Sequence, residues 1–370
     1  MVNPNTDQRN ILTLDAGGTN FVFSSIKGNK ESSNIFTLPA VTDNIDECLN
    51  TLIKGFNMVK ERLNEPISAI SFAFPGPADY DNGIIGDLPN FPAFKGGVPL
   101  GPILEEIYQI PVFINNDGNL FAYGEALVGF LPELNKKLAV KGSTKKCKNM
   151  IGITLGTGFG CGITLNNKLL AGDSSCGAEI HNTLNKYSSN WNAEESVSTR
   201  AIQRVYAEES ETVFNGELMP KDIYNIATGK IDGDKKAAIK AFESYGEALG
   251  SSIANVVTLI DGIVVLGGGI TAAWSLFSPA MFTELNRKYE NHLGEKSNRL
   301  SFKIFDLEDD STFNEFAKGN VKELKIPNSN KTIKYDSLPR TGVGISKIGG
   351  SKATMLGAYA YALQQLDSIS

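Results

Sequence analysis

A glycine-rich turn between two short apolar runs occurs twice in this chain, and this repeat constrains the fold more than any other feature. The first copy reads ILTLD (11–15), AGGTN and FVFSSI (21–26). The second copy follows about 140 residues later and reads IGITL (151–155), GTGFG and CGITL (161–165). Apolar runs on both sides of a glycine turn predict β-hairpins. A repeat on this scale predicts two domains of related topology.

Helical and strand-like segments alternate between and after the two hairpins. We expect helices at 45–63, 101–109, 119–130, 194–209, 235–260 and 351–366, and strands at 67–74, 111–115 and 262–269. Leu131 and Pro132 should end the third of these helices and open a solvated, lysine-rich loop at 136–148. The alternation of strands and helices indicates a mixed α/β protein.

The same pattern predicts the extent of two domains. A small N-terminal α/β domain would comprise 1–120 together with the last helix, 351–370. A larger C-terminal α/β domain would comprise 121–350. Within it, the segment 296–345 is polar and charged and has no sustained periodicity, so we expect an irregular insertion there.

Composition and charge exclude several classes of protein. No apolar run reaches the ~20 residues that a membrane span needs, and the start MVNPNTDQRN lacks the features of a signal peptide. We therefore expect a cytoplasmic protein without a membrane partner. The net charge of −6 argues against binding to nucleic acid. The four cysteines form no C-x-x-C pair, so we expect inert or buried thiols.

The first glycine turn is a candidate phosphate site. Gly17 and Gly18 have no Cβ that would keep their N–H groups from a phosphate, and Thr19 adds a hydroxyl donor. Asp15, at the end of the preceding strand, could orient Mg²⁺ directly or through water. A plain tight turn is the alternative, because paired glycines commonly serve that purpose.

Two further glycine clusters strengthen the interpretation as a nucleotide site. The equivalent turn of the second copy consists of Gly156, Thr157 and Gly158. A third cluster ends an apolar strand and consists of Gly267, Gly268 and Gly269. The two turns could hold a triphosphate from both sides, and the third cluster is suited to the flat face of a base and ribose. Three unrelated turns would be an unusual coincidence.

Asp117 follows the apolar strand expected at 111–115 and precedes the helix expected at 119–130. A carboxylate at the carboxyl end of a strand is well placed for a cleft. There it could orient a hydroxyl group and take its proton during phosphoryl transfer. The alternative is a helix cap, which is a frequent use of Asp at such a position.

Glu179 and His181 follow the second hairpin and form a candidate sugar-binding pair. A carboxylate and a neutral imidazole together suit adjacent hydroxyl groups of a pyranose. The chain has two histidines, His181 and His292, and neither lies near a G-x-S-x-G sequence. Hydrolase chemistry of the serine–histidine type is therefore not expected.

Six motifs in this order resemble those of the ROK family (repressor, open reading frame, kinase): DAGGTN, PGP, INNDGN, LGTGFG, GAEIH and VVLGGG. The resemblance runs from about residue 11 to 365, with 131–149 and 296–345 as insertions. It implies the two-domain fold of actin and hexokinase (ribonuclease H-like), with an interdomain cleft. It also implies transfer of the γ-phosphoryl group of ATP, with Mg²⁺, to a hexose or N-acetylhexosamine, often at the 6-hydroxyl. Family members often form dimers, so a homodimer is among the expected assemblies.

The resemblance also implies roles for particular residues. Asp117 would be the catalytic base. The ATP phosphates would be held by Gly17, Gly18, Thr19 and Gly156 to Gly158, and adenosine would lie against Gly267 to Gly269. The sugar would be contacted by Asn90, Asn116, Asp117, Glu179, His181 and Glu194.

Two departures from the family pattern concern the sugar-binding region. The usual E-x-G-H is shortened here to Glu179-Ile180-His181. Many family members follow this histidine with three zinc-binding cysteines, whereas this chain has NTLNKYSSNWNA (182–193). We therefore expect no structural zinc.

Three rival functions follow from the same motifs. A ROK-type regulator would carry a winged helix-turn-helix before the first hairpin, but only about ten residues precede Ile11. A sugar-binding pseudokinase would account for the altered Glu–His motif, and an ATPase of the actin or chaperone type would share the fold. Asp117 and the two glycine turns favour a sugar kinase over these rivals.

Overall fold

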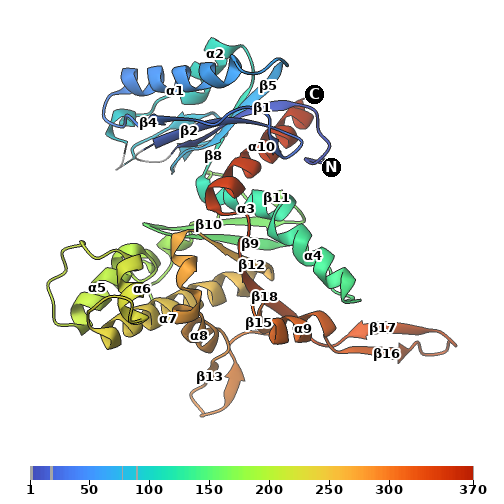
Figure 1. Ribbon diagram of the computed structural model, residues 1–370. Coiled ribbons are helices and arrows are strands. Elements are labelled where there is room, and N and C mark those ends of the chain that lie inside the picture. The colour runs from blue at the N-terminus through green and yellow to red at the C-terminus, as the bar shows by residue number, and fades with distance from the viewer. Residues whose placement is uncertain (1–2, 17–19, 77, 89–90, 370) are drawn as a thin grey trace. The chain divides into compact units, whose positions relative to one another are not determined.

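Both predicted glycine hairpins form, and each belongs to a mixed β-sheet (Figure 1). The computed structural model describes residues 3–16, 20–76, 78–88 and 91–369. In the first hairpin, β1 (Asn10–Ala16) pairs antiparallel with β2 (Asn20–Lys27). In the second, β9 (Met150–Leu155) lies beside β10 (Phe159–Leu165).

The chain divides into two compact units. Unit 1 comprises Met1–Pro132, Gly162–Ala178 and Lys347–Ser370, and unit 2 comprises Glu133–Cys161 and Glu179–Ser346. The units differ from the predicted domains mainly because 121–132 and 162–178 lie in unit 1. Gly162 explains part of this difference, since a Cβ at this position would meet the carbonyl of Gly118. This close approach fixes the middle of β10 against the start of a unit 1 helix.

The sheet of unit 1 has the strand order β3-β2-β1-β5-β8, with β4 paired to β2. Its other strands are β3 (Lys30–Glu31), β4 (Phe36–Pro39), β5 (Ile67–Ala73) and β8 (Val112–Asn115). Strands β1, β5 and β8 run parallel. A separate short ribbon consists of β6 (Ala78–Asp79) and β7 (Ile84–Ile85).

Helices cover both faces of this sheet (Figure 1). They are α1 (Ile45–Lys60) and α2 (Leu100–Tyr108) on one face, and α3 (Asp117–Leu127) and α10 (Gly350–Ile369) on the other. Phe56 on the apolar face of α1 is buried, and the centroid of its ring lies 5.2 Å from that of Phe23. Gly124 and Gly357 let α3 and α10 approach closely, because a Cβ on either would meet backbone of the other helix.

The second sheet has the strand order β11-β10-β9-β12-β18-β15. Strands β9, β12, β18 and β15 belong to unit 2, whereas β11 and the second half of β10 belong to unit 1. Its other strands are β11 (Lys168–Leu169), β12 (Ile263–Gly267), β15 (Lys303–Asp306) and β18 (Arg340–Ile345). Strands β9, β12, β18 and β15 run parallel. The boundary between the units falls within β10. Each sheet thus contains a glycine hairpin with parallel strands beside its first strand, two in the first sheet and three in the second.

The helices of unit 2 are α5 (Thr199–Glu209), α6 (Pro220–Ala227), α7 (Lys235–Ile260), α8 (Trp274–Leu285) and α9 (Asp310–Lys318). Asp234 caps α7, its carboxylate accepting hydrogen bonds from the N–H groups of Lys236 and Ala237 at 2.9 and 3.0 Å. Two small residues of α7, Gly246 and Gly250, bring it close to α8. No helix of the described residues combines the length and apolar composition needed to cross a bilayer.

The prediction that Pro132 ends a helix is wrong. A further helix, α4 (Phe130–Val140), contains this proline in its first turn, where a missing N–H costs little. The lysine-rich segment after it is also tied down. Asn135 exchanges two hydrogen bonds of 2.9 Å with the backbone of Cys147.

The prediction of an irregular insertion at 296–345 is also wrong. Strands β15 and β18 belong to the main sheet of unit 2, and Phe305 and Val343 are buried in it. Each strand is only four to six residues long, which is too short for a period to stand out among charged neighbours. Two hairpins lie outside this sheet, β13 (Lys288–Glu290) with β14 (Lys296–Asn298), and β16 (Val321–Lys325) with β17 (Thr332–Asp336).

Candidate active site

The carboxyl ends of β1, β5 and β8 meet at one edge of the unit 1 sheet. The register pairs Asp15 with Ala73, and Ala73 with Asn115. Asp15 at the end of β1 and Asp117 just beyond β8 therefore lie at the same edge. In open α/β sheets, this edge is where ligands bind.

Asp117 is the first residue of α3, and its neighbour supplies the helix cap. The side-chain oxygen of Asn116 accepts hydrogen bonds from the N–H groups of Gly118 and Asn119 at 2.8 and 3.3 Å. Asp117 Oδ1 also accepts from the Gly118 N–H, at 2.9 Å. The second oxygen, Oδ2, accepts no hydrogen bond from the described residues. Asn116 fills most of the capping role, so the carboxylate of Asp117 can serve another purpose.

Crowding by the protein changes the acidity of Asp117. The side chain is exposed to solvent, yet many protein atoms surround it. This desolvation raises the pKa of the carboxyl above the ordinary aspartate value, and the negative charge of Asp15 acts in the same direction. The hydrogen bond from Gly118 opposes both effects. A carboxylate with a raised pKa is a stronger base.

Two buried amides hold the start of α3 in place. Asn119 Nδ2 donates to Asn115 Oδ1 at 3.0 Å, and the same oxygen accepts from the Asn116 N–H at 2.8 Å. Both amide side chains are buried. We did not predict this role for Asn115 and Asn119, although three asparagines in the motif INNDGN were a signal for it.

The carboxylate of Asp15 has a partner that the sequence did not predict. The hydroxyl of Ser351, in the first turn of α10, donates to Asp15 Oδ2. These two residues are 336 positions apart, and no local pattern connects them. Four other predicted site residues, Gly17, Gly18, Thr19 and Asn90, lie outside the described residues.

In unit 2, two glycine clusters lie at one sheet edge. Gly156 to Gly158 follow β9. Gly267 is the last residue of β12, Gly268 and Gly269 follow it, and the register pairs Gly267 with Thr154. At Gly156 and Gly269 no protein atom lies within 4 Å of the place a Cβ would take, so both glycines leave open space. Gly268 differs, because its φ is +93° and a Cβ there would collide with the Leu155 carbonyl, so the fold itself requires glycine.

Side chains from a following segment hold the turn after β9. Glu194 Oε2 accepts from the Phe159 N–H at 3.0 Å, and its other oxygen lies 3.3 Å from Arg200. Thr199 donates to the Gly156 carbonyl through its N–H and its hydroxyl, at 2.9 and 3.1 Å. Glu194, which we predicted to contact sugar, is thus placed against the turn. The role of Thr199 had no signal in the sequence.

Glu179 and His181 lie together. Glu179 Oε2 is 2.9 Å from His181 Nδ1, and each side chain is about one-third exposed. A carboxylate that accepts the Nδ1–H fixes the ring and leaves Nε2 as a hydrogen-bond acceptor. An acceptor nitrogen beside a carboxylate oxygen can bind two hydroxyl groups of one sugar.

The sequence pattern of the ROK family matches residues 11–309 of the chain. This chain belongs to the ROK family. The match spans most of the length over which the six motifs predicted it.

Named relatives and a solved structure agree with this membership. A glucokinase of Halalkalibacterium halodurans is 28% identical over 287 residues, covering 70% of this chain and 80% of that protein. An N-acetyl-D-glucosamine kinase of Vibrio parahaemolyticus is 27% identical over 276 residues, covering 70% and 83%. The crystal structure of a glucokinase from Parabacteroides distasonis is 48% identical, with a TM-score of 0.89 over 98% of this chain and 99% of that one. The predicted α/β fold of ROK kinases is confirmed.

The segment 182–193 is held together by the amide side chain of Asn185. Asn185 is nearly buried, and its Nδ2 donates to the Asn192 carbonyl at 2.7 Å and to the Ser196 hydroxyl at 2.8 Å. Its Oδ1 accepts from the Tyr187 N–H at 2.8 Å. Among the described residues, no group of three or more His, Cys, Asp or Glu side chains could hold a metal ion.

Proposed function

We propose that this chain is an ATP-dependent kinase that phosphorylates a hydroxyl group, at the 6-position, of a hexose or N-acetylhexosamine. The observation that carries the proposal is the carboxylate of Asp117, which has a raised pKa and one oxygen without a partner among the described residues. Similarity to glucokinases and to an N-acetyl-D-glucosamine kinase supports the class of acceptor.

Asp117 acts as the general base. A sugar hydroxyl is a poor nucleophile near neutral pH, so a carboxylate that orients it and takes its proton lowers the barrier to transfer. The hydroxyl oxygen forms the new bond to phosphorus, the bond from the γ-phosphorus to the bridging oxygen breaks, and ADP leaves. The buried amides of Asn115 and Asn119 keep Asp117 in position.

The glycine edge of unit 2 binds ATP. Open space at Gly156 and Gly269 lets backbone N–H groups approach phosphate, and lets a flat base and ribose approach the chain. Gly17, Gly18 and Thr19 contribute further donors to the phosphates. Carboxylate oxygen is a preferred Mg²⁺ ligand, so Asp15 fits the metal, which when bound neutralises charge on the β- and γ-phosphates.

The sugar is held by the paired side chains of Glu179 and His181, together with Asn90 and Asn116. The carboxylate accepts from one hydroxyl, and His181 Nε2 accepts from a neighbouring one. The observation in favour of a second candidate, a sugar-binding protein without turnover, is that Glu194 is hydrogen-bonded to the Phe159 N–H and paired with Arg200. The shortened Glu–His motif points in the same direction.

One assay separates the kinase from this alternative. Release of ADP from MgATP is measured with a panel of hexoses, hexosamines and N-acetylated sugars, and with a blank that contains no sugar. Turnover that depends on one or two of the sugars supports the kinase and names its substrate. No turnover with any sugar, combined with sugar binding by calorimetry, refutes the kinase in favour of the binding protein.

A further inference from the structure

Strands β16 and β17 form a hairpin that extends away from the rest of unit 2 (Figure 1). We call residues 321–336 the arm. The two strands pair with each other and with no other strand of the described chain, and all of β16 and most of β17 is exposed. A two-stranded hairpin by itself is marginally stable in water.

The root of the arm is nevertheless firmly anchored. Arg340 is buried, and its guanidinium donates to the Phe316 carbonyl and to Asp336 Oδ2, both at 2.6 Å. Asp336 closes the end of β17, and its other oxygen accepts from the Asn320 N–H at 3.0 Å. A buried, paired arginine therefore fixes the position from which the arm extends. An irregular surface loop does not need this anchor.

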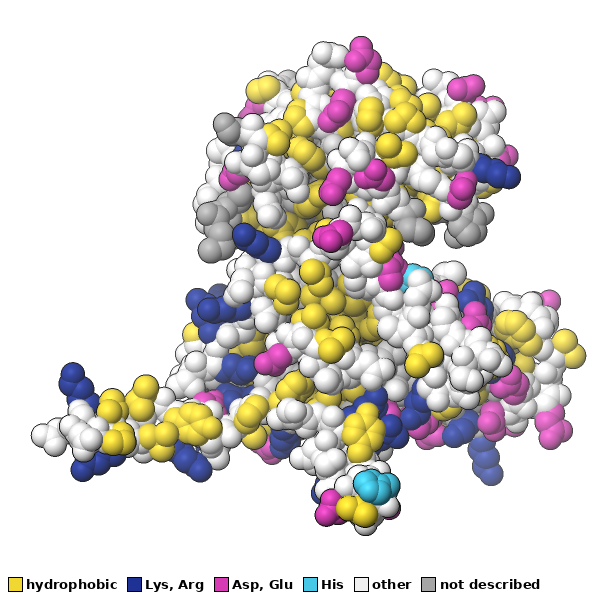
Figure 2. All heavy atoms as spheres, turned by 180° about the vertical axis from the view of Figure 1, so that it is seen from behind, with side chains coloured by type: hydrophobic (Ala, Val, Ile, Leu, Met, Phe, Trp, Pro, Cys, Tyr) yellow, Lys and Arg dark blue, Asp and Glu magenta, His cyan; other side chains and the backbone are white. Residues whose placement is uncertain are grey.

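One face of the arm is apolar and has no cover. The register places Leu324 opposite Ile333, and Lys322 opposite Tyr335, so these four side chains share a face. Of the three apolar side chains, Leu324 is 44% exposed, Ile333 is 58% exposed and Tyr335 is 51% exposed. Figure 2 shows hydrophobic and basic side chains together along this projection. Contiguous exposed apolar side chains mark an interaction surface.

The arm is basic within an acidic protein. Its charged residues are Lys322, Glu323, Lys325, Lys331, Lys334 and Asp336, a net charge of +2. The whole chain carries −6, so the remainder carries −8. An acidic surface that also exposes apolar side chains would complement the arm.

The chain contains such a surface between α5 and α6. We call residues 209–219 the acidic loop, since ESETVFNGELM contains three glutamates and no basic residue. Val213, Phe214, Leu218 and Met219 are all exposed, by 85%, 49%, 40% and 50%. Gln203 anchors this loop, donating to the carbonyls of Gly216 and Leu218 at 3.0 and 2.9 Å.

The arm and the acidic loop of one chain cannot meet. The helices that flank the loop pack on α7, whereas the arm follows α9 beside β15, at the far end of unit 2 (Figure 1). The two surfaces match in charge and in apolar character, yet they are widely separated within the unit. A second copy of the chain can satisfy both.

We propose that the arm of one chain binds the acidic loop of a second copy. The apolar side chains of both segments pack together, and Lys322 and Lys331 of the arm face Glu211 and Glu217 of the loop. With two-fold symmetry the contact occurs twice, because the arm of each copy meets the loop of the other. This closed arrangement leaves no arm free and gives a dimer.

Sedimentation velocity across a concentration series tests the apolar part of the contact. The unaltered chain sediments as a dimer. Replacing Leu324 and Ile333 together with serine weakens dimerisation at least about tenfold, as expected for residues at the centre of an interface. Leu293→Ser is the control, because Leu293 is an exposed leucine (70%) on the separate hairpin of β13 and β14, and it leaves the dimer intact.

A charge exchange tests the pairing itself. The arm variant Lys322→Glu with Lys331→Glu and the loop variant Glu211→Lys with Glu217→Lys are each monomeric alone. Mixed together they form a dimer, because both contacts of the mixed pair join opposite charges. A general effect on folding cannot produce this rescue.

Circular dichroism and thermal melting establish that each variant is folded before it is compared. A monomeric unaltered chain overturns the proposal, whether or not the arm binds some other acidic molecule. A dimer that survives the substitutions in the arm overturns it as well. A mixture of the two charge variants that stays monomeric excludes the pairing of arm and loop.

Discussion

At the scale of one residue, Asp117 at the start of α3 is our proposed base. A neighbouring asparagine takes over the cap, and crowding raises the pKa of the carboxyl. We expect Asp117→Asn to lower kcat by about 10²–10⁴-fold while sugar binding is kept, because the amide preserves shape but cannot accept a proton. Steady-state kinetics and calorimetry measure the two effects. Asp46→Asn, exposed on α1, is the control, and near-normal turnover of Asp117→Asn would rule out the base.

The same residue predicts a pH dependence. The base works only when deprotonated, so kcat/KM should fall as the pH decreases through the pKa of Asp117. Because desolvation by the surrounding protein atoms and the charge of Asp15 raise this pKa, the fall should be centred above the ordinary aspartate value of 3.8. A pH series of kcat/KM, over a range in which the chain stays folded, measures it. The proposal for Asp117 fails if the residual activity of Asp117→Asn has the same acid limb.

At the scale of the element, two neighbouring glycines after β12 have different roles: Gly268 is required by the fold, and Gly269 leaves space that we assign to the nucleotide. Gly268→Ala should destabilise the chain by about 1–3 kcal/mol, because the alanine would keep a φ of +93° and its Cβ would collide with the Leu155 carbonyl. Gly269→Ala should leave the melting temperature unchanged, since nothing fills its Cβ position, but should raise the KM for ATP. Thermal melting and kinetics on the pair separate the two roles. An unchanged KM in Gly269→Ala would refute the nucleotide site at this edge.

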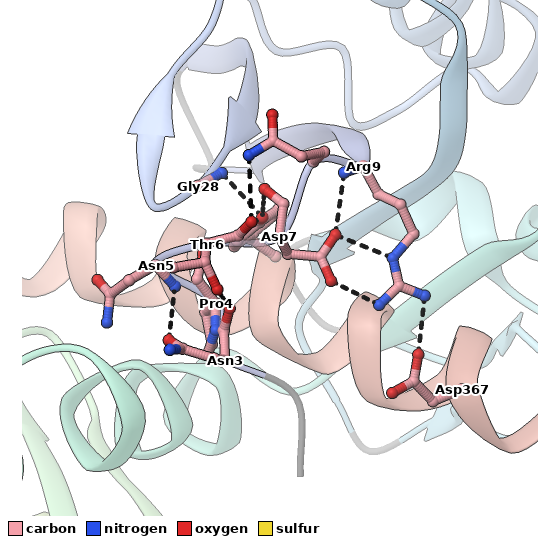
Figure 3. Close-up of polar contacts among 10 residues, drawn as sticks. Asn3, Pro4, Asn5, Thr6, Asp7, Arg9, Gly28 and Asp367 are labelled. Atoms are coloured by element: carbon pink, nitrogen blue, oxygen red, sulfur yellow. Dashed lines mark hydrogen bonds and ion pairs between the residues drawn. The ribbon is translucent and has the colours of Figure 1, made fainter.

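At the scale of the whole molecule, the N-terminal segment contacts the last helix, α10, within unit 1. Arg9 forms a two-pronged contact with Asp7, at 3.0 and 2.7 Å, and reaches Asp367 of α10 at 2.8 Å (Figure 3). The Arg9 hydrogen bond lowers the pKa of Asp7. The hydrogen bond between Arg9 and Asp7 therefore stabilises the fold fully above the pKa that Asp7 has in the unfolded chain. This stabilisation is lost as the pH falls through the lower pKa of Asp7 in the folded chain.

We expect Arg9→Ala to lower the melting temperature by about 2 °C near neutral pH, since a partly exposed ion pair contributes about 1 kcal/mol or less. The difference from the unaltered chain should shrink at acid pH, once Asp7 is protonated in both states. Thermal melting over a pH series measures it. Arg62→Ala, an exposed arginine of the same unit, should show no such dependence, and equal behaviour of the two variants would contradict the role of Arg9.

Metal content is a second property of the whole molecule. The segment 182–193 has no cysteine, and Asn185 links its backbone instead. We expect the purified chain to contain no stoichiometric zinc by elemental analysis, and EDTA to leave its melting temperature unchanged. Asn185→Ala, in contrast, should cost about 1–3 kcal/mol because buried polar groups lose their partners. One zinc per chain would show that this reading of the segment is wrong.

Local patterns in the sequence determined much of the fold. The glycine hairpins, the amphipathic helix α1 and the junction between β8 and α3 were all predictable, because side-chain periodicity and turn residues act over a few positions. Asp117 was proposed as the base for the same kind of reason, from its place between a strand and a helix. The order of six motifs predicted the family, which residues 11–309 confirm.

Contacts between distant residues decided the rest. Strands β15 and β18 belong to the sheet because of their parallel neighbours, and Ser351 meets Asp15 across 336 positions. Glu194 lies against the turn after β9, and Gly269 is open where Gly268 is packed. Each of these facts depends on which element lies beside which. Which elements become neighbours is determined by the burial of apolar surface and by strand register over the whole chain. The residues next to a given position in the sequence do not contain this information.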